Sequence, residues 1–293
     1  MKTFLTLLIF STLNLNVFAC LNGDSKTLKN GNYLYEDYFE SVPRGHFFYK
    51  PDAKLIFKLD SLYKATKDVD YLSDKGYVLI VQGKYEEAIQ LYLNIEKTHP
   101  NRYSTASNIG TAYELSGQNE KALQWIKKAI TLDPSSHHGS EWIHVNILTA
   151  KINHNDVINS DFLLQTSFGN AAMPITTISA NQLDTLKKQL FYQLNERVSF
   201  VKPKDKIVAT LYFDFGNMAL LKGDRGDAKN AYILARDYGY NNFSLLRKRM
   251  DAADGKKPET NKTWIYWCAA ILLIAILFFF WMKNKASNKL HRS

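Results

Sequence analysis

Apolar residues recur along the middle of the chain with the period of an α-helix. Leu55 and Leu59 share one face of a helix that we expect over residues 52–67, and leucines repeat in the same way along 181–200. Such stripes predict amphipathic helices that bury one side. The stretch 166–180 breaks the pattern with glycine, proline and β-branched residues, so we expect an inserted loop or a short strand there.

Small residues and a proline repeat at a constant distance of 34 residues. Glycine allows two helices to cross closely and tolerates a left-handed turn, alanine is a small partner on the second helix, and proline ends a helix. The pattern therefore predicts antiparallel helix pairs. The first set is Gly76, Gly83, Ala88 and Pro100, and the second, 34 residues later, is Gly110, Gly117, Ala122 and Pro134. A third set, Gly216, Gly223 and Ala228, keeps the same internal spacing and begins 106 residues after Gly110.

This 34-residue pattern resembles the tetratricopeptide (TPR) repeat. The resemblance implies an all-α solenoid of stacked antiparallel helix pairs. Residues 52–136 would hold one helix and repeats 1 and 2, and residues 206–250 would hold repeat 3. Between them, 137–205 is expected to be a degenerate helical region with an inserted loop. Residues 20–51 are expected to form an irregular N-terminal arm.

The resemblance also implies a concave groove that binds other proteins or extended peptides. Packing between repeats is the alternative role for its side chains. Ser73 and Tyr77 stand where one TPR subset has the lysine and asparagine of a carboxylate clamp, so no such clamp is expected. The matching first-helix positions are Ser73, Tyr77, Ile80, Ser104, Ser107, Asn108, Thr111, Glu114, Tyr212, Phe213, Asn217 and Leu220.

The N-terminus has the pattern of an export signal. Residues 1–19 carry Lys2 and then an apolar stretch too short to span a bilayer, which predicts a cleaved signal peptide. Cys20 follows Ala19, and this junction resembles the lipobox of bacterial lipoproteins. Plain cleavage, acylation of Cys20 to give a lipid-anchored assembly factor, and an uncleaved anchor all stay open.

The C-terminal region predicts one transmembrane helix. Residues 264–282 contain no charge, and at about 1.5 Å per residue they match the ~30 Å hydrocarbon core. A polar linker, 251–263, precedes them. The tail 283–293 is basic, which predicts a cytoplasmic location. We therefore expect a single-pass protein of the cell membrane, with residues 20–263 exported to the periplasmic or extracellular side.

Composition and charge exclude several classes of protein. The 293 residues are 46% hydrophobic and 22% charged, which suits a folded core rather than a disordered chain. Two cysteines are too few for a disulfide scaffold. The net charge of +9 comes largely from the two ends, and elsewhere basic and acidic residues alternate. Nucleic acid is therefore not an expected partner.

Candidate chemistry is sparse. The chain lacks the common phosphate-binding, hydrolase and metalloprotease motifs, so we predict no enzyme, no cofactor and no metal site. His137, Glu141 and His144 would share a helix face and could hold a metal or transfer a proton. We interpret them, with His138, as exposed histidines of a first helical turn.

The sequence thus predicts a membrane-anchored TPR-like protein whose exported domain binds or scaffolds other proteins at the cell envelope. The alternative is an accessory or catalytic subunit of an envelope-processing system, with its site around His137, Glu141 and His144.

Overall fold

The structure is a computed structural model. It describes residues 25–256 and 267–278, apart from 39, 53 and 154–157. The chain divides into two compact units at residue 254, and each is described by itself. The predicted signal peptide, Cys20 and the basic tail lie outside the described residues.

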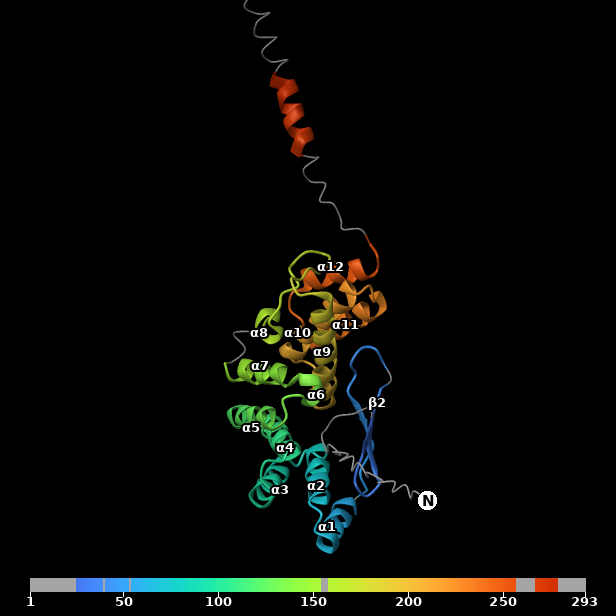
Figure 1. The fold of residues 1–293 in the computed structure, drawn as a ribbon. Helices are drawn as coiled ribbons and strands as arrows, with labels where there is room; N and C mark the ends of the chain where they lie inside the picture. Colours follow the sequence, from blue (N-terminus) through green and yellow to red (C-terminus); the bar gives the residue numbers. More distant parts are fainter. Residues whose placement is uncertain (1–24, 39, 53, 154–157, 257–266, 279–293) are drawn as a thin grey trace, which may run out of the picture. The chain divides into compact units, whose positions relative to one another are not determined.

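The first unit is mostly helical, and its helices follow one another in chain order (Figure 1). They are α1 (Leu55–Thr66), α2 (Asp70–Val81), α3 (Tyr85–Thr98), α4 (Tyr103–Leu115), α5 (Asn119–Leu132), α6 (Ser136–Gly139), α7 (Glu141–Ile152), α8 (Ser160–Leu164), α9 (Ala180–Phe200), α10 (Lys206–Leu221), α11 (Arg225–Tyr238) and α12 (Phe243–Ala253). α12 extends three residues into the stretch predicted as a linker from 251.

The N-terminal segment is not an irregular arm, and the unit is therefore not all-α. Strands β1 (Ser25–Thr27), β2 (Tyr33–Asp37) and β3 (His46–Phe48) form an antiparallel sheet in the order β1-β2-β3. Tyrosine and phenylalanine favour strands, and Asn30-Gly31 is a hairpin signal. Gly31 adopts φ +84°, and its N–H donates to Leu28 O at 2.8 Å.

Three helix pairs, α2/α3, α4/α5 and α10/α11, are closely packed hairpins. A Cβ added to Gly76 would lie 2.5 Å from Cε2 of Tyr92, and one added to Gly216 would lie 2.5 Å from Cε1 of Tyr232. Only a glycine lets these helices approach so closely. The alanines of the repeat pattern are fully buried on the second helices: Ala88, Ala122 and Ala228.

The hairpin turns use left-handed glycines, and the second helices stop before the prolines. Gly83 has φ +74° and Gly223 has φ +86°, a region that costs glycine least. α3 and α5 end before Pro100 and Pro134 respectively. The 34-residue spacing therefore corresponds to one helix pair and its turn.

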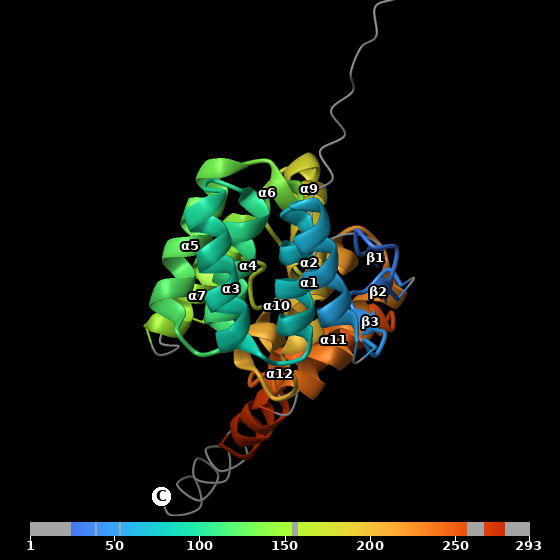
Figure 2. The same ribbon diagram turned by 90° about the horizontal axis from the view of Figure 1, so that it is seen from below.

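The region between α5 and α10 is not a regular helix pair. α7 packs against α5, and the long α9 packs against α6, α7, α10 and β3. Figure 2 shows the sheet on the side of the unit opposite α5 and α7. The segment 165–179 is a loop without a strand. A capping box formed by Ser179 and Gln182 begins α9.

In the second unit the structure describes residues 255–256 and 267–278, and the stretch 267–278 is helical and exposed. Residues 264–266 and 279–282 of the predicted span lie outside the described residues. Among the helices that the structure describes, none has both the length and the apolar character needed to cross a membrane.

Candidate functional site

The side chains expected to line an open groove are nearly all buried. Eight are at most 4% exposed, three others are also buried, and only Thr111 is half-buried. The open groove expected on these positions is therefore absent from the described unit. The eight are Ser73, Tyr77, Ile80, Asn108, Tyr212, Phe213, Asn217 and Leu220, and the next three are Ser104, Ser107 and Glu114.

The N-terminal sheet and the loop between β2 and β3 cover predicted groove positions of α2 and α10. Tyr77 belongs to a buried cluster with Leu34 and Tyr35 of β2. The Tyr212 hydroxyl donates to Pro43 O at 2.7 Å. These covering residues come from outside the repeats, so the repeat pattern alone gave no sign of them.

Two predicted groove asparagines instead hold helices together. Asn108 Nδ2 donates to the Tyr92 hydroxyl at 2.9 Å, and that hydroxyl donates to Ser73 O at 2.7 Å. In repeat 3, Asn217 Oδ1 accepts from the Tyr232 hydroxyl at 3.0 Å. These bonds satisfy buried polar groups between helices, the alternative role considered above.

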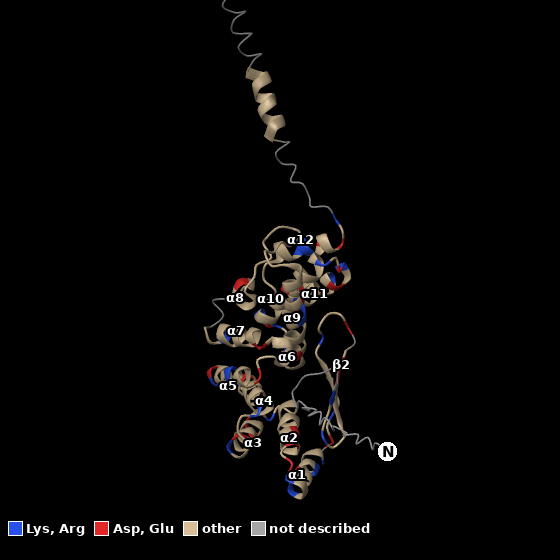
Figure 3. Ribbon diagram, viewed as in Figure 1, with Lys and Arg blue, Asp and Glu red and all other residues tan. Residues whose placement is uncertain are grey.

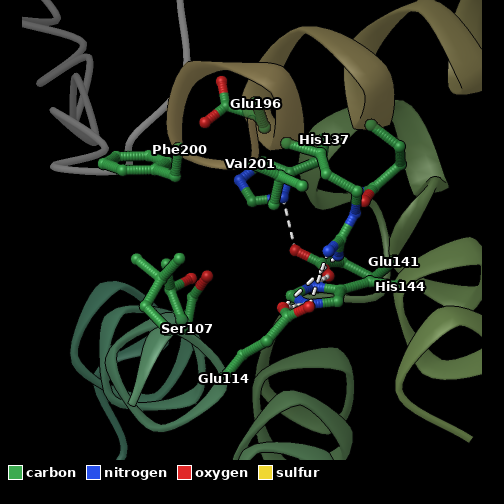
Figure 4. A pocket seen from close by; sticks show the side chains of 12 residues that line it. Ser107, Glu114, His137, Glu141, His144, Glu196, Phe200 and Val201 are labelled. Atoms are coloured by element: carbon green, nitrogen blue, oxygen red, sulfur yellow. Dashed lines mark hydrogen bonds and ion pairs between the residues drawn. The ribbon is translucent and has the colours of Figure 1, made fainter. Parts of the chain in front are cut away.

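One small pocket remains where α4, α6, α7 and α9 meet (Figure 4). It brings predicted groove positions of α4 together with the histidine cluster. Its volume of about 60 Å³ admits a few water molecules and is far below the roughly 300 Å³ of a typical ligand site. The lining residues are Ser107, Thr111, Glu114, Leu115, His137, Glu141, His144, Gln193, Glu196, Arg197, Phe200 and Val201.

Glu114 is the best-bonded carboxylate of the pocket. It accepts from Arg197 Nη1 at 2.6 Å, His144 Nε2 at 2.6 Å and Lys151 Nζ at 2.7 Å. Burial opposes ionisation, but the charges of Arg197 and Lys151 outweigh it and hold the pKa of Glu114 well below its usual range. Glu114 therefore stays ionised inside the unit.

Glu141 is held in a similar way. It pairs with His137 Nδ1, accepts from the Tyr103 hydroxyl at 3.2 Å and lies 3.4 Å from His144 Nδ1. Burial again opposes ionisation, and the bonds from His137 and His144 outweigh it, so the pKa of Glu141 is lowered. Burial lowers the pKa of His144, but Glu114 and Glu141 outweigh it and raise that pKa.

The histidines expected to be exposed are largely buried. The side chains of His137 and His144 are only 10% and 11% exposed, whereas His138 is exposed. His137 adopts φ +54° and His138 φ +57°, so a kink and not a regular first turn directs the His137 ring to Glu141.

A second buried cluster adjoins the pocket through Glu196. His46 Nε2 lies 2.9 Å from Glu196 Oε1, and its Nδ1 pairs with Asp37. The His46 ring stacks on Tyr35 at 3.9 Å between centroids. Burial lowers the pKa of His46, but Glu196 and Asp37 outweigh it and raise that pKa to about 9.

Sequence reasoning missed the residues that α9, the strands and neighbouring helices add to these clusters. No motif or period relates them to the histidines, so only the folded chain reveals their proximity. They are Asp37, His46, Tyr103, Lys151, Gln193, Glu196 and Arg197.

The pocket offers a polar network that is largely bonded within the protein, although Glu141 Oε2 and Arg197 Nε have no hydrogen-bond partner among the described residues. In the described part of the chain, no group of three or more histidine, cysteine, aspartate or glutamate residues is arranged to hold a metal ion. The Glu114 and Glu141 carboxylates already accept bonds from cationic or hydroxyl donors. This arrangement is suited to fixing helices in place.

The sheet and the residues that flank its strands expose four aromatic side chains, Tyr33, Tyr38, Phe47 and Tyr49. Tyr33 is 65% exposed, and Phe47 is 47% exposed with its ring 5.4 Å from Tyr49 and 6.3 Å from Tyr38. On the helices, by contrast, acidic and basic residues alternate (Figure 3), as expected of solvated surfaces.

Comparisons with known proteins give limited matches. A family model described as "Domain of unknown function (DUF6340)" matches residues 74–149, less than half of the chain. No curated protein matches the sequence. The assignment of TPR-like helix pairs to this chain rests on its own repeat spacing and glycine geometry.

Two solved structures have similar helices. One is a thermophilic TPR protein of Thermus thermophilus, with 13% identity, 68% of this chain and 88% of that chain covered, and a TM-score of 0.33. The other is a tetratricopeptide repeat protein from Parabacteroides merdae, with 14% identity, 68% and 91% coverage, and a TM-score of 0.29.

Proposed function

We propose that the chain is a single-pass membrane protein whose exported helical unit binds or scaffolds other proteins at the cell envelope. The observation that carries this proposal is the set of three helix hairpins α2/α3, α4/α5 and α10/α11, of which the first two are 34 residues apart and pack against each other. Stacked helix pairs present long surfaces and few chemical groups of their own, which suits partner binding.

The two ends of the sequence support the location. The uncharged run 264–282 and the basic tail 283–293 predict one span with its C-terminal end in the cytoplasm. The apolar leader predicts export of residues 20–263. Acylation of Cys20 would add a second anchor, and incorporation of labelled palmitate that Cys20→Ala abolishes would demonstrate it.

The exposed aromatic side chains of the sheet region support partner binding. Tyrosine and phenylalanine are enriched at protein interfaces, and clustered exposed apolar side chains are uncommon on isolated soluble surfaces. Here Tyr38, Phe47 and Tyr49 are exposed and their rings are in contact.

The test is affinity purification of the full chain from membranes in mild detergent, followed by mass spectrometry. The control is a folded carrier protein joined to residues 255–293, which keeps the predicted anchor and lacks the helical unit. We expect envelope proteins that accompany the full chain and are missing from the control. Identical protein lists would contradict the proposal, as would cytoplasmic labelling of a tag placed directly after the predicted leader.

Catalysis in the small pocket is a second candidate function. The convergence of His137, Glu141, His144 and Glu196 on one pocket favours it. A catalytic role predicts that Glu141→Gln abolishes the cellular function while partner retention and the melting temperature persist. Because Glu141 is buried and bonded, a parallel fall in melting temperature would instead indicate a structural role.

A further inference from the structure

A larger pocket lies between α7, α9 and the loop that precedes α9. Its volume is about 380 Å³, within the roughly 300–1,000 Å³ of ligand sites. The apolar lining consists of Trp142, Leu164, Ile178 and Leu186. None of the other lining residues is charged: Gln165, Thr166, Asn181, Gln182, Thr185 and Gln189. This pocket shares no lining residue with the smaller one.

The α7 side of this pocket is fixed before any ligand arrives. Trp142 Nε1 donates to Gln189 Oε1 at 3.2 Å. Gln189 Nε2 in turn donates to His138 O at 3.1 Å and Gly139 O at 3.0 Å. The indole ring and the Gln189 amide therefore have set orientations, which reduces the entropy lost on binding.

The loop side is also held in place. Arg249 is fully buried, and its Nη2 donates to Phe168 O and Gly169 O at 2.7 Å each. Thr166 and Thr176 join their hydroxyls at 3.1 Å across the loop. These bonds hold the loop in place, so it forms an ordered wall of the pocket.

Hydrogen-bonding capacity remains at the rim. Within the described residues, no hydrogen bond uses the side-chain amides of Gln165 or Asn181, and each amide offers donors and an acceptor. The Thr185 hydroxyl donates to Asn181 O at 3.0 Å and can still accept. Amide and hydroxyl groups of this kind complement the N–H and C=O groups of an extended peptide backbone.

We propose that this pocket binds an extended, uncharged peptide segment of a partner protein, with one apolar side chain on the floor beside Trp142. This inference rests on the proposed function, because it takes the partner to be a protein. It adds the site at which that partner binds. A charged side chain would lose hydration here without gaining an opposite charge. The three aliphatic side chains and the single indole ring of the lining suit an apolar side chain better than a sugar, because a sugar needs many hydrogen bonds.

The experiment screens the full chain in detergent against a library of random hexapeptides with blocked ends. The test variant Thr185→Tyr places a ring over the pocket. The matched control is Thr131→Tyr on α5, because Thr131 is also exposed and its hydroxyl also bonds the carbonyl four residues earlier, Lys127 O at 3.0 Å. Unfolding temperatures establish that both variants fold, and Asn181→Tyr on the same rim replaces Thr185→Tyr if that variant does not.

We expect selected peptides with an apolar residue and no charge. Their affinity should fall about tenfold or more in Thr185→Tyr, stay unchanged in Thr131→Tyr and vary little with salt. Absence of any selected peptide, selection of charged peptides, or equal affinity in Thr185→Tyr would overturn the proposal. So would binding to a glycan array that Thr185→Tyr blocks. If membrane partners are still recovered while no peptide binds, this site fails and the proposed function stands.

Discussion

Arg197 Nη1 on α9 lies 2.6 Å from Glu114 Oε1 on α4, and both side chains are only 6% exposed. The two residues are 83 positions apart in the sequence. Their buried ion pair fixes the long inserted helix against the second repeat. The concave side of that repeat is consequently occupied by the chain itself.

Removing Arg197 should destabilise the helical unit strongly. Arg197→Met leaves the buried Glu114 carboxylate without its largest opposing charge, and breaking such a pair costs about 3–5 kcal/mol. Urea unfolding of the full chain measures the loss. Glu114→Gln combined with Arg197→Met should cost less than the two single changes added together, because neither charge is then left alone.

The exposed pair Lys229–Asp254 provides the comparison, with Nζ and Oδ1 at 2.8 Å and side chains 49% and 31% exposed. Lys229→Met should change the unfolding free energy by less than about 1 kcal/mol. If Lys229→Met and Arg197→Met changed the unfolding free energy equally, the role assigned to the buried pair would be contradicted.

Replacing the glycines at the helix crossings by alanine should destabilise the unit to different extents. At Gly216 the new methyl meets the Tyr232 ring, which a bond to Asn217 holds, and we expect a loss of about 1–3 kcal/mol. At Gly110 it meets Cδ1 and Cγ1 of Ile126 at 2.5 and 2.7 Å and the Ile126 backbone nitrogen at 3.3 Å. A change of rotamer relieves the side-chain contacts, which a rigid ring cannot do, so the loss should be smaller than at Gly216.

Gly226 near the start of α11 is the internal control for this series, since a Cβ there meets nothing within 4 Å. Gly226→Ala should be neutral or stabilising by up to about 1 kcal/mol, as helix propensity favours alanine. Thermal unfolding ranks the three variants. An equal or larger loss at Gly110 than at Gly216 would show that Tyr232 is not the constraint.

His46 should make stability fall at alkaline pH. Its folded pKa of about 9 exceeds the unfolded value of about 6.5, so its contribution is complete below pH 6.5. The contribution is lost as pH rises through 9, by up to about 3 kcal/mol. Urea unfolding between pH 6 and 9.5 should show this slope in the wild type and in His99→Gln, an exposed control, but not in His46→Gln.

Asp214 on α10 should lower the stability of the unit near neutral pH, so replacing it should stabilise the unit there. It is fully buried, and its Oδ1 accepts from Ser160 Oγ at 2.9 Å and Asn217 Nδ2 at 3.1 Å. Burial raises its pKa to about 7, because these two bonds only partly offset the loss of hydration. The folded state therefore holds this proton more tightly than the unfolded state does.

Stability is consequently lost as pH rises from about 4 to 7. Asp214→Asn keeps the shape and removes the titration, so its unfolding free energy relative to wild type should increase over that range, by up to about 4 kcal/mol. The unfolding free energies of the wild type and of Asp214→Asn at pH 4.5 and pH 7.5 test this prediction. A constant difference between the two values would mean that Asp214 does not titrate there.

Local contacts explain what the sequence could predict. Gly76 and Tyr92 belong to one helix pair, so their spacing repeats with the unit and is visible without a structure. One of the two carboxylate partners of His46, by contrast, is Glu196, which is 150 residues away and follows no period. The hairpin signal Asn30-Gly31 was present in the arm, but the aromatic residues around it do not alternate cleanly between the two faces.

The histidine cluster was half predictable. Helical spacing correctly placed His144 near Glu141, since both lie on α7. The burial of His137 depends on a kink with positive φ, which no histidine-specific rule anticipates. The arginine that completes the pocket comes from α9, whose amphipathic stripe predicts a helix but not its neighbours.

The N-terminal segment also changes how the whole helical unit comes apart. Lys29 N–H donates to Asp74 on α2 at 2.6 Å, and Ser41 Oγ donates to Asp227 on α11 at 2.5 Å. In an open stack each repeat touches only its neighbours, and repeats can melt one after another. Because the N-terminal segment bonds to both the first and the third repeat, it links the unfolding of one to the unfolding of the other. We therefore expect the helical unit to unfold in a single cooperative transition, and cleavage of the N-terminal segment to give stepwise unfolding.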